Sequence, residues 1–421
     1  MFGHIFPKGG RSSAVAINTS AQVVGKIFGA STTFLLSFVI ARQFGASGFG
    51  DFVKITTFVS FFFLVADFGL NAIYMQHSED HALPVLFGLR VIGGIGLMFI
   101  CVAILAFLPQ SNSQGYTAIV RIGIVVFAPA IIFQALITTA NAIFQKHLRY
   151  IDATIAVVAG SIVTLTILWL VWISNVRIGG SILGVVALLG GSIVTSIVSL
   201  WLASRITPLS VSFSMPQMGK LFFATVPLGI TLISNVVYAH ADSVILAFTR
   251  SSAEVGTYGL AYKVFETILV LPTFFMNAVY PVMLIAYQRS NGFSGLVKKA
   301  ALVLVVGSFI LFVFSWFCAP YFAYIKSDFI SSILYFRILA ISLPLFFLSS
   351  LTMWILIIYK RQWQLAWLYG IGMFLNIGLN IWLVPQFGPI ASAWITVFSE
   401  GVILIVSSVL IFPLLSKIAK A

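Results

Sequence analysis

The sequence predicts an all-α polytopic membrane protein, and three observations support that fold class. Hydrophobic residues make up 60% of the 421 positions, whereas charged residues make up only 8%. A soluble globular chain carries about 25% charged residues, so this chain cannot cover itself with a water-exposed surface. Its apolar segments are also long enough for helices of about 20 residues to cross a bilayer. Soluble enzymes, disordered chains and disulfide scaffolds are therefore excluded.

Short polar stretches divide the apolar sequence into about twelve predicted transmembrane helices. Their connections are too short to fold into an attached soluble domain. We expect the helices at residues 17–41, 52–76, 83–108, 117–143, 151–174, 180–203, 219–248, 257–287, 297–318, 330–358, 363–384 and 388–414.

A weak internal repeat indicates two pseudo-symmetric six-helix lobes around a central cavity. Gly50 at the entry to the second predicted helix corresponds to Gly256 before the eighth, and Gly180 at the sixth corresponds to Gly388 at the twelfth. The offsets are 206 and 208 residues, which agree within loop variation. We therefore expect an N-terminal lobe at 1–210 and a C-terminal lobe at 211–421. Transporters commonly bind substrate where such repeats meet.

The basic residues predict the orientation. The chain has a formal net charge of +13, and we attribute much of that surplus to loops retained in the cytoplasm, not to nucleic-acid binding. With twelve helices, fourteen Lys and Arg residues fall on the side of both termini and eight on the opposite side. We therefore expect a bacterial inner-membrane protein with both termini in the cytoplasm and a retained N-terminus.

Known catalytic and cofactor motifs are absent from the sequence. It has no nucleotide-binding G-x-x-x-x-G-K-[ST] motif and no H-E-x-x-H zinc motif. Cys101 and Cys318 both lie in apolar segments, so we expect neither a disulfide nor a metal site, and we expect no cofactor. The pattern predicts a transporter and not an enzyme.

Polar residues recur on one face of four predicted helices, two in each half. In the first helix Asn18, Gln22 and Lys26 are spaced by one turn. The second helix has Asp67, the seventh has Asn235 and Asp242, and the eighth has Glu266. Lys263 lies near the start of the eighth helix. Ionisable groups inside a membrane are costly and normally face a cavity or a partner. We interpret the ionised residues as lining one aqueous cavity. For single Ser and Thr residues, helix–helix hydrogen bonding is the better explanation.

Further charged residues allow two interpretations. Arg121 belongs either to the cavity or to an interface stripe on the fourth helix. Arg337 and Glu400 form either a stabilising ion pair or part of the cavity. Arg42 and Lys54 lie near the predicted outer ends of helices, where long basic side chains normally extend to the interface. We keep these last four as second-tier candidates.

Several segments resemble one known family. They are Ala41–Phe52 (ARQFGASGFGDF), Asp67–Leu70 (DFGL), Asp242–Leu246 (DSVIL), Glu254–Tyr258 (EVGTY) and Pro385–Ala393 (PQFGPIASA) followed by Ser399-Glu400. In order and spacing they are similar to the Wzx-type polysaccharide flippases of the multidrug/oligosaccharidyl-lipid/polysaccharide exporter superfamily. The likeness covers essentially the whole chain.

The resemblance implies a flippase that turns undecaprenyl-diphosphate-linked oligosaccharides, such as O-antigen repeat units, to the outer leaflet by alternating access. It also implies action beside a Wzy-type polymerase and a chain-length regulator. The diphosphate needs cations along its path, and charge balance or binding of H⁺ or Na⁺ needs carboxylates. We assign substrate binding to Lys26, Arg90, Arg121, Lys263, Asn18, Gln22 and Asn235, and ion coupling or charge balance to Asp67, Asp242 and Glu266.

Two other functions are weighed against this one. A cation-coupled multidrug exporter of the same superfamily would have a negatively biased cavity. A polysaccharide polymerase or ligase would need a long outer loop with catalytic residues, for which the predicted loops leave no room.

Overall fold

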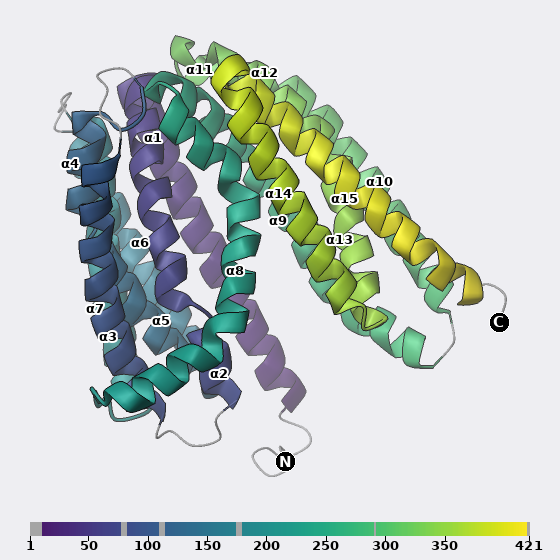
Figure 1. Cartoon of the computed structure of the whole chain (residues 1–421), viewed down its shortest axis with the longest axis horizontal. Coiled ribbons are helices and arrows are strands. Elements are labelled where there is room, and N and C mark those ends of the chain that lie inside the picture. Colours follow the sequence, from purple (N-terminus) through teal and green to yellow (C-terminus); the bar gives the residue numbers. More distant parts are fainter. Residues whose placement is uncertain (1–10, 77–81, 109–113, 174–178, 290–291, 419–421) are drawn as a thin grey trace. The chain divides into compact units, whose positions relative to one another are not determined.

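The computed structural model describes residues 11–76, 82–108, 114–173, 179–289 and 292–418, and helices are the only regular elements within them. Figure 1 traces these helices along the chain. Ten helical stretches in this part of the chain are long and apolar enough to cross a membrane. Large apolar side chains such as Phe223, Phe317 and Phe412 are about three-quarters exposed, as expected of a surface solvated by lipid.

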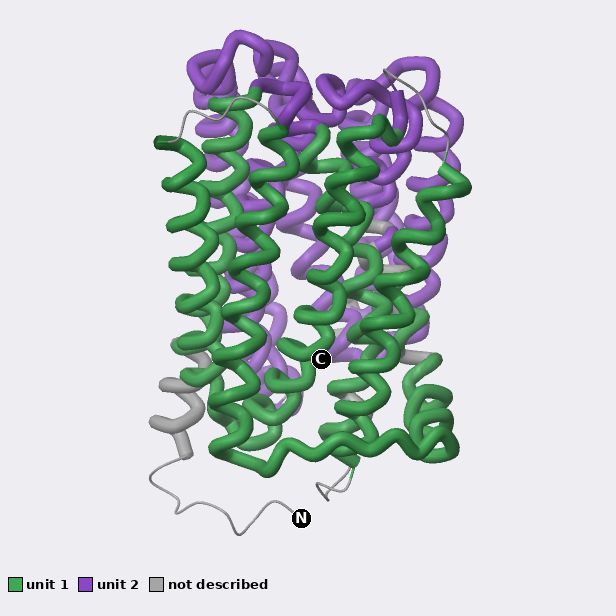
Figure 2. The backbone as a smooth tube through the Cα atoms, turned by 90° about the vertical axis from the view of Figure 1, so that its left-hand side faces the viewer, with its two compact units in different colours: residues 1–44, 51–112, 116–233 green, residues 45–50, 113–115, 234–421 purple. Residues whose placement is uncertain are grey.

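The chain divides into two compact units, coloured separately in Figure 2. Unit 1 comprises residues 1–44, 51–112 and 116–233, and unit 2 comprises residues 45–50, 113–115 and 234–421. The predicted lobe boundary lay at residues 210 and 211. The division between the units falls later because the first half of α8 packs in unit 1, where Met218 and Leu221 belong to a buried apolar cluster.

Unit 1 contains the first six predicted spans. Its helices are α1 (Arg11–Asp67), α2 (Leu70–Gln76), α3 (Ala82–Ile104), η1 (Leu105–Phe107), α4 (Ala118–Phe127), α5 (Ala130–Lys146), α6 (Tyr150–Ile173), α7 (Gly180–Ser204) and the first half of α8 (Met215–Thr249).

Unit 2 contains the remaining spans. Its helices are the second half of α8, α9 (Ser252–Gln288), α10 (Phe293–Cys318), η2 (Ala319–Tyr321), α11 (Phe322–Ile325), η3 (Ser327–Phe329), α12 (Ile330–Ile341), α13 (Leu343–Ile358), α14 (Gln362–Phe387) and α15 (Pro389–Ile418).

Breaks inside the helices reconcile the twelve predicted spans with these elements. The first two spans follow each other directly in α1, whose backbone is kinked at the non-helical Gly45 (φ 72°, ψ −170°). The fourth span comprises α4 and α5, and the tenth comprises α12 and α13, each divided near a proline. α8, with 35 residues, is the seventh span. The described helices thus confirm the all-α membrane fold with about twelve spans.

Small residues let helices approach closely. At the α6–α7 contact, a Cβ on Gly160 would lie 1.9 Å from Thr195 Oγ1, and one on Gly191 would lie 2.0 Å from Thr164 Oγ1. The repeat-related Gly50 and Gly256 also meet, within unit 2. A Cβ on Gly50 would lie 1.6 Å from the Ser252 carbonyl oxygen, and one on Gly256 would lie 2.8 Å from Gly50 N. Close packing of this kind stabilises helix–helix contacts in a membrane, where the hydrophobic effect does not drive helices together.

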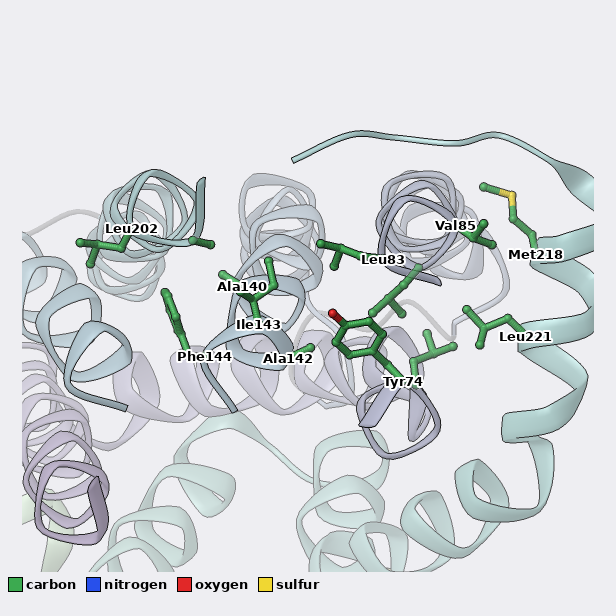
Figure 3. Close-up of a cluster of buried hydrophobic side chains, with 13 residues drawn as sticks. Tyr74, Leu83, Val85, Ala140, Ala142, Ile143, Phe144, Leu202, Met218 and Leu221 are labelled. Carbon is green, nitrogen blue, oxygen red and sulfur yellow. The ribbon is translucent and has the colours of Figure 1, made fainter. Parts of the chain in front are cut away.

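A buried apolar cluster holds the ends of α2, α3, α5 and α7 against the start of α8 (Figure 3). Tyr74 and Phe144 are fully buried in it, and Met218 contributes from α8. The Lys146 ammonium lies 4.6 Å from the Tyr74 ring centroid, a favourable cation–π distance. This cluster fixes the first turn of α3 and thereby the helix that carries Arg90.

Candidate functional site

A helix break positions the first acidic candidate. α1 ends at Asp67 and α2 begins at Leu70, because Phe68 (φ 39°) and Gly69 (φ 73°) have left-handed backbone conformations. The Phe68 ring stacks on Phe222 of α8 with centroids 5.3 Å apart. Only a glycine fits at position 229 beside it, since a Cβ there would lie 2.6 Å from the Phe68 ring. Packing against α8 therefore maintains a backbone conformation that Phe rarely adopts.

Arg90 from α3 crosses to this break. Its Nη2 donates to Asp67 Oδ1 at 2.9 Å and to Asn71 Oδ1 at 2.7 Å. The Arg90 side chain is completely buried, whereas the Asp67 side chain is 39% exposed. Arg90 Nε and Nη1 are buried and lack a hydrogen-bond partner within the described residues. Buried N–H groups without a hydrogen-bond acceptor are rare in proteins, so those of Arg90 require an explanation.

The other unit 1 candidates on α1 have different surroundings. Lys26 is exposed and Gln22 is half-buried beside Tyr150, to whose side chain it is hydrogen-bonded. The side chain of Asn18 lies outside the described residues. α1 packs closely on α6 at this level, where Thr154 Oγ1 donates to Ala21 O at 2.7 Å. The structure thus brings Asp67 and Arg90 together but does not bring Lys26 into their hydrogen-bond network.

Arg121 binds backbone carbonyls. Its Nε donates to Tyr116 O at 3.3 Å, and its Nη2 donates to Leu108 O. These contacts connect the start of α4 to the end of the preceding helical segment. They favour the interpretation in which Arg121 stabilises the helix start over the one in which it lines a cavity.

The second-tier candidates of unit 1 differ in burial. Arg42 is exposed, as expected of a side chain near a helix end. Lys54, in contrast, is fully buried, so the expectation that it extends to the interface is wrong. The reason is that α1 continues past Gly45 into the packed interior, where Phe52 and Ile55 are also buried.

In unit 2, Lys263 and Glu266 form a local ion pair on α9. Lys263 Nζ lies 3.1 Å from Glu266 Oε2, and the two side chains are 38% and 40% exposed. The spacing of three residues places them on neighbouring turns of one helix face. The predicted polar face of this helix therefore has both charges available to solvent.

Asp242 on α8 is a buried carboxylate that accepts hydrogen bonds from Tyr258 and Ser243 and interacts electrostatically with His240. It is 4% exposed, its Oδ2 accepts a hydrogen bond from the Tyr258 hydroxyl, and its Oδ1 accepts one from Ser243 N–H at 2.6 Å. Tyr258 stacks on Tyr262, whose ring also contacts His240. The side chain of Asn235, one candidate on the same helix, lies outside the described residues.

Arg337 and Glu400 each interact with a different residue. The Arg337 guanidinium lies 5.0 Å from the Trp316 ring centroid, and Glu400 accepts a hydrogen bond from the Ser349 hydroxyl. Of the two interpretations left open for Arg337 and Glu400, the described residues therefore do not support the ion pair. Arg337 lies on the face of α12 that packs on α10, whereas Glu400 lies on the face of α15 that packs on α13.

Two partners were missed from the sequence. The pairing of Asn71 with Arg90 was not predicted, and Tyr258 was not recognised as the donor to Asp242. The Phe68-Gly69 dipeptide inside an apolar run was the available signal for the first, because it marks the break that lets both Asp67 and Asn71 face α3. Over the described residues, no three His, Cys, Asp or Glu side chains cluster as metal ligands would.

Comparisons with known proteins agree with this architecture. The family model described as polysaccharide biosynthesis protein matches residues 15–286. No curated protein matches the chain.

Solved structures with the same fold include the lipid II flippase MurJ in an inward closed conformation, with 15% identity, a TM-score of 0.74, and 94% of this chain and 89% of that chain covered. An inward-facing multidrug resistance MATE family transporter of the MOP superfamily has 14% identity and a TM-score of 0.76, covering 95% of this chain and 99% of that one.

A MOP superfamily transporter from Pyrococcus furiosus, described as having a binding pocket of reverse polarity, has 16% identity and a TM-score of 0.61, covering 97% and 96% of the two chains. At these identities the likeness establishes the fold. The family match spans well over half of the sequence, and the chain therefore belongs to the polysaccharide biosynthesis protein family.

Proposed function

We propose that this protein is a flippase that moves undecaprenyl-diphosphate-linked oligosaccharides, such as O-antigen repeat units, from the cytoplasmic to the periplasmic leaflet. It works by alternating access between two six-helix lobes, residues 1–210 and 211–421, in the bacterial inner membrane. Both termini lie in the cytoplasm, and the product is passed to a Wzy-type polymerase with its chain-length regulator. The family match and the fold of lipid and drug transporters support this proposal.

The Arg90 cluster is the observation that carries the proposal. A buried guanidinium with two N–H groups that lack partners among the described residues is a strong donor for phosphate oxygens. Its ionic partner among the described residues, Asp67, is also the solvent-exposed member of the pair. A diphosphate that enters from the Asp67 side competes with this carboxylate for Arg90. The pair thereby compensates the charge of the empty site and releases Arg90 when substrate arrives.

The remaining candidates divide between substrate and ion. Lys26 and Lys263, both accessible, supply further cations to the diphosphate, with Gln22, Asn18 and Asn235 as hydrogen-bonding groups for the sugars. Asp67, Asp242 and Glu266 balance these charges or bind the coupling ion. The isoprenoid tail stays in lipid, because the outer faces of the helices are apolar.

The test is complementation in the native host after deletion of the gene. We expect loss of surface polysaccharide and accumulation of undecaprenyl-diphosphate repeats, with rescue by the intact gene and none by Arg90→Gln at equal protein level. Arg205→Gln, which neutralises an exposed cation stacked on Trp201, is the matched control and should rescue. Full rescue by Arg90→Gln would refute the assignment of the site.

A cation-coupled multidrug exporter is the second candidate, and the high TM-score of 0.76 to a multidrug MATE transporter favours it. It predicts that deletion leaves polysaccharide unchanged and that overexpression raises resistance to cationic dyes. A polymerase or ligase is the third, and it predicts that lipid-linked repeats reach the outer leaflet in the deletion strain but remain unpolymerised.

A further inference from the structure

Three aromatic rings gather four helix ends at one end of unit 2. Tyr287 at the end of α9 lies 5.5 Å from Phe293 at the start of α10 and 4.9 Å from Tyr359 after α13, measured between ring centroids. The Tyr359 hydroxyl donates to Leu414 O of α15 at 3.3 Å. Figure 1 shows the α13–α14 turn, the α9–α10 ends and the end of α15 at the same end of this unit. Residues on these segments therefore share one surface.

That surface is strongly basic. The gathered ends have five exposed cations and no acidic residue between 284 and 300, 355 and 372, or 405 and 418. The cations are Arg289, Lys298, Lys299, Lys360 and Arg361, which we call the basic patch. None of them forms an ion pair within the described residues, in contrast to Arg149, Arg250 and Lys263 elsewhere.

The corresponding turn of unit 1 shows that this is not a general property of the fold. α5 and α13 end in the same way, with Arg149 N–H bonded to Phe144 O and Arg361 N–H bonded to Leu356 O, both at 2.8 Å. In unit 1, however, Arg149 is paired with Asp152 at 2.7 Å, and Lys146 stacks on Tyr74. The cations of the unit 1 turn have partners inside the unit, whereas those of the unit 2 turn face outward.

Lys360 also has an unfavourable backbone conformation. Its φ is 58°, in the left-handed region that glycine adopts most easily at a helix end. A non-glycine residue in this region is strained. The equivalent Leu148 of unit 1 has the same conformation (φ 54°), so the conformation belongs to this kind of turn and the exposed charge is what distinguishes Lys360.

An apolar groove continues from the patch along α14 and α15. It has a volume of about 260 Å³, and its lining begins at Gln364, one turn after Arg361, and continues through Trp367, Leu368 and Ile371. A second groove of about 470 Å³ follows on the same two helices, lined by Leu379, Leu383 and Trp394. Cations at one end and an apolar channel leading into the membrane match the two parts of an amphiphile.

We propose that the basic patch and the adjoining α14–α15 groove form a binding site for an anionic phospholipid of the surrounding bilayer. The phosphate group contacts Lys360 and Arg361, supported by Arg289, Lys298 and Lys299, and one acyl chain lies in the groove beside Trp367. Each Lys or Arg in a cluster at a membrane surface raises the affinity for anionic headgroups about fivefold, which corresponds to about 1 kcal/mol. The site is independent of the transported substrate.

The test uses the full-length protein in phosphatidylcholine vesicles that contain a minority of phosphatidylglycerol. Electron spin resonance with spin-labelled phosphatidylglycerol and spin-labelled phosphatidylcholine measures how strongly the protein prefers the anionic lipid. We expect Lys360→Gln/Arg361→Gln to lower this preference by about fivefold or more. The control Arg205→Gln/Lys220→Gln removes two exposed cations from unit 1 and should change it by much less.

A second arm tests the groove. Phosphatidylglycerol with brominated acyl chains should quench part of the tryptophan fluorescence, and Trp367→Phe should remove that part. An unchanged lipid preference in Lys360→Gln/Arg361→Gln, or an equal loss in the control, would overturn the proposal. So would displacement of the spin-labelled phosphatidylglycerol by one equivalent of a polyprenyl diphosphate, since the patch would then belong to a diphosphate-bearing lipid.

Discussion

Each unit has an acid–base pair on a polar helix face, but the two pairs are built differently. In unit 1, Arg90 reaches Asp67 across a helix break from 23 positions further along the chain, and its side chain is completely buried. In unit 2, Lys263 and Glu266 are neighbours on one helix and both are more than a third exposed. A buried charge depends on its partner, because an unpaired one has lost its hydration, whereas an exposed pair contributes little.

The same contrast extends to the buried carboxylate of unit 2. Asp242 is nearly as buried as Arg90, but it accepts hydrogen bonds from a tyrosine hydroxyl and a backbone N–H and interacts electrostatically with His240. Unit 1 thus has a buried cation at Arg90. Unit 2 has a buried carboxyl group at Asp242, which has no Lys or Arg partner in the described residues. Within the proposed function, this difference separates a substrate-binding role for Arg90 from an ion-coupling or charge-balancing role for Asp242.

The largest effect is expected for Asp67→Ala. It leaves the buried Arg90 without its ionic partner, and breaking such a pair costs about 3–5 kcal/mol. Arg90→Met should destabilise less, because the remaining Asp67 carboxylate is exposed enough to be hydrated. Melting temperatures of the purified variants in detergent measure the order. If Arg90→Met melts lower than Asp67→Ala, burial does not control this pair.

A smaller loss is expected for Tyr258→Phe. The variant keeps the ring but removes the hydroxyl that donates to Asp242, which leaves a buried carboxyl oxygen without its partner at a cost of about 1–3 kcal/mol. Tyr258→Phe combined with Asp242→Leu should restore part of that loss, since both polar partners are then gone. Additive losses in the double variant would show that the two residues do not interact.

The two equivalent turns allow a test in which stability rises. Leu148 (φ 54°) and Lys360 (φ 58°) both lie in the left-handed region, so Leu148→Gly and Lys360→Gly should each stabilise the protein by about 0.5–1 kcal/mol. Thermal melting measures this gain. Only Lys360→Gly should also weaken the preference for anionic lipid. Loss of that preference in Leu148→Gly would remove the distinction between the two turns.

The smallest effect is expected for Lys263→Ala/Glu266→Ala. An exposed pair at this spacing contributes about 0.3–0.5 kcal/mol, so the melting temperature should hardly change. Export of polysaccharide in the complementation assay should nevertheless decrease, since the proposal assigns both side chains to the transport path. Unchanged export would restrict the substrate-binding role to unit 1.

Local patterns predicted the features that depend on neighbouring residues. The lengths of the apolar runs indicated the number of spans, because a backbone in lipid must satisfy its own hydrogen bonds as a helix. The pairing of Lys263 with Glu266 was not predicted, although their spacing of three residues on one helix permits it. The repeat of Gly50 and Gly256 was visible as similar motifs, although nothing in either motif indicated that the two glycines touch each other.

The sequence by itself determined the fold class, the approximate spans and the set of polar faces, since each of these depends on composition and helical periodicity over short distances. Only the tertiary structure decided which charged groups meet. Arg90 pairs with Asp67 and Asn71 because Phe222 of α8 packs on Phe68 and stabilises the break between α1 and α2. Arg337 instead stacks on Trp316, and Lys54 is buried, because side-chain partners depend on which helix faces pack together, and helical periodicity alone carries no information about that packing.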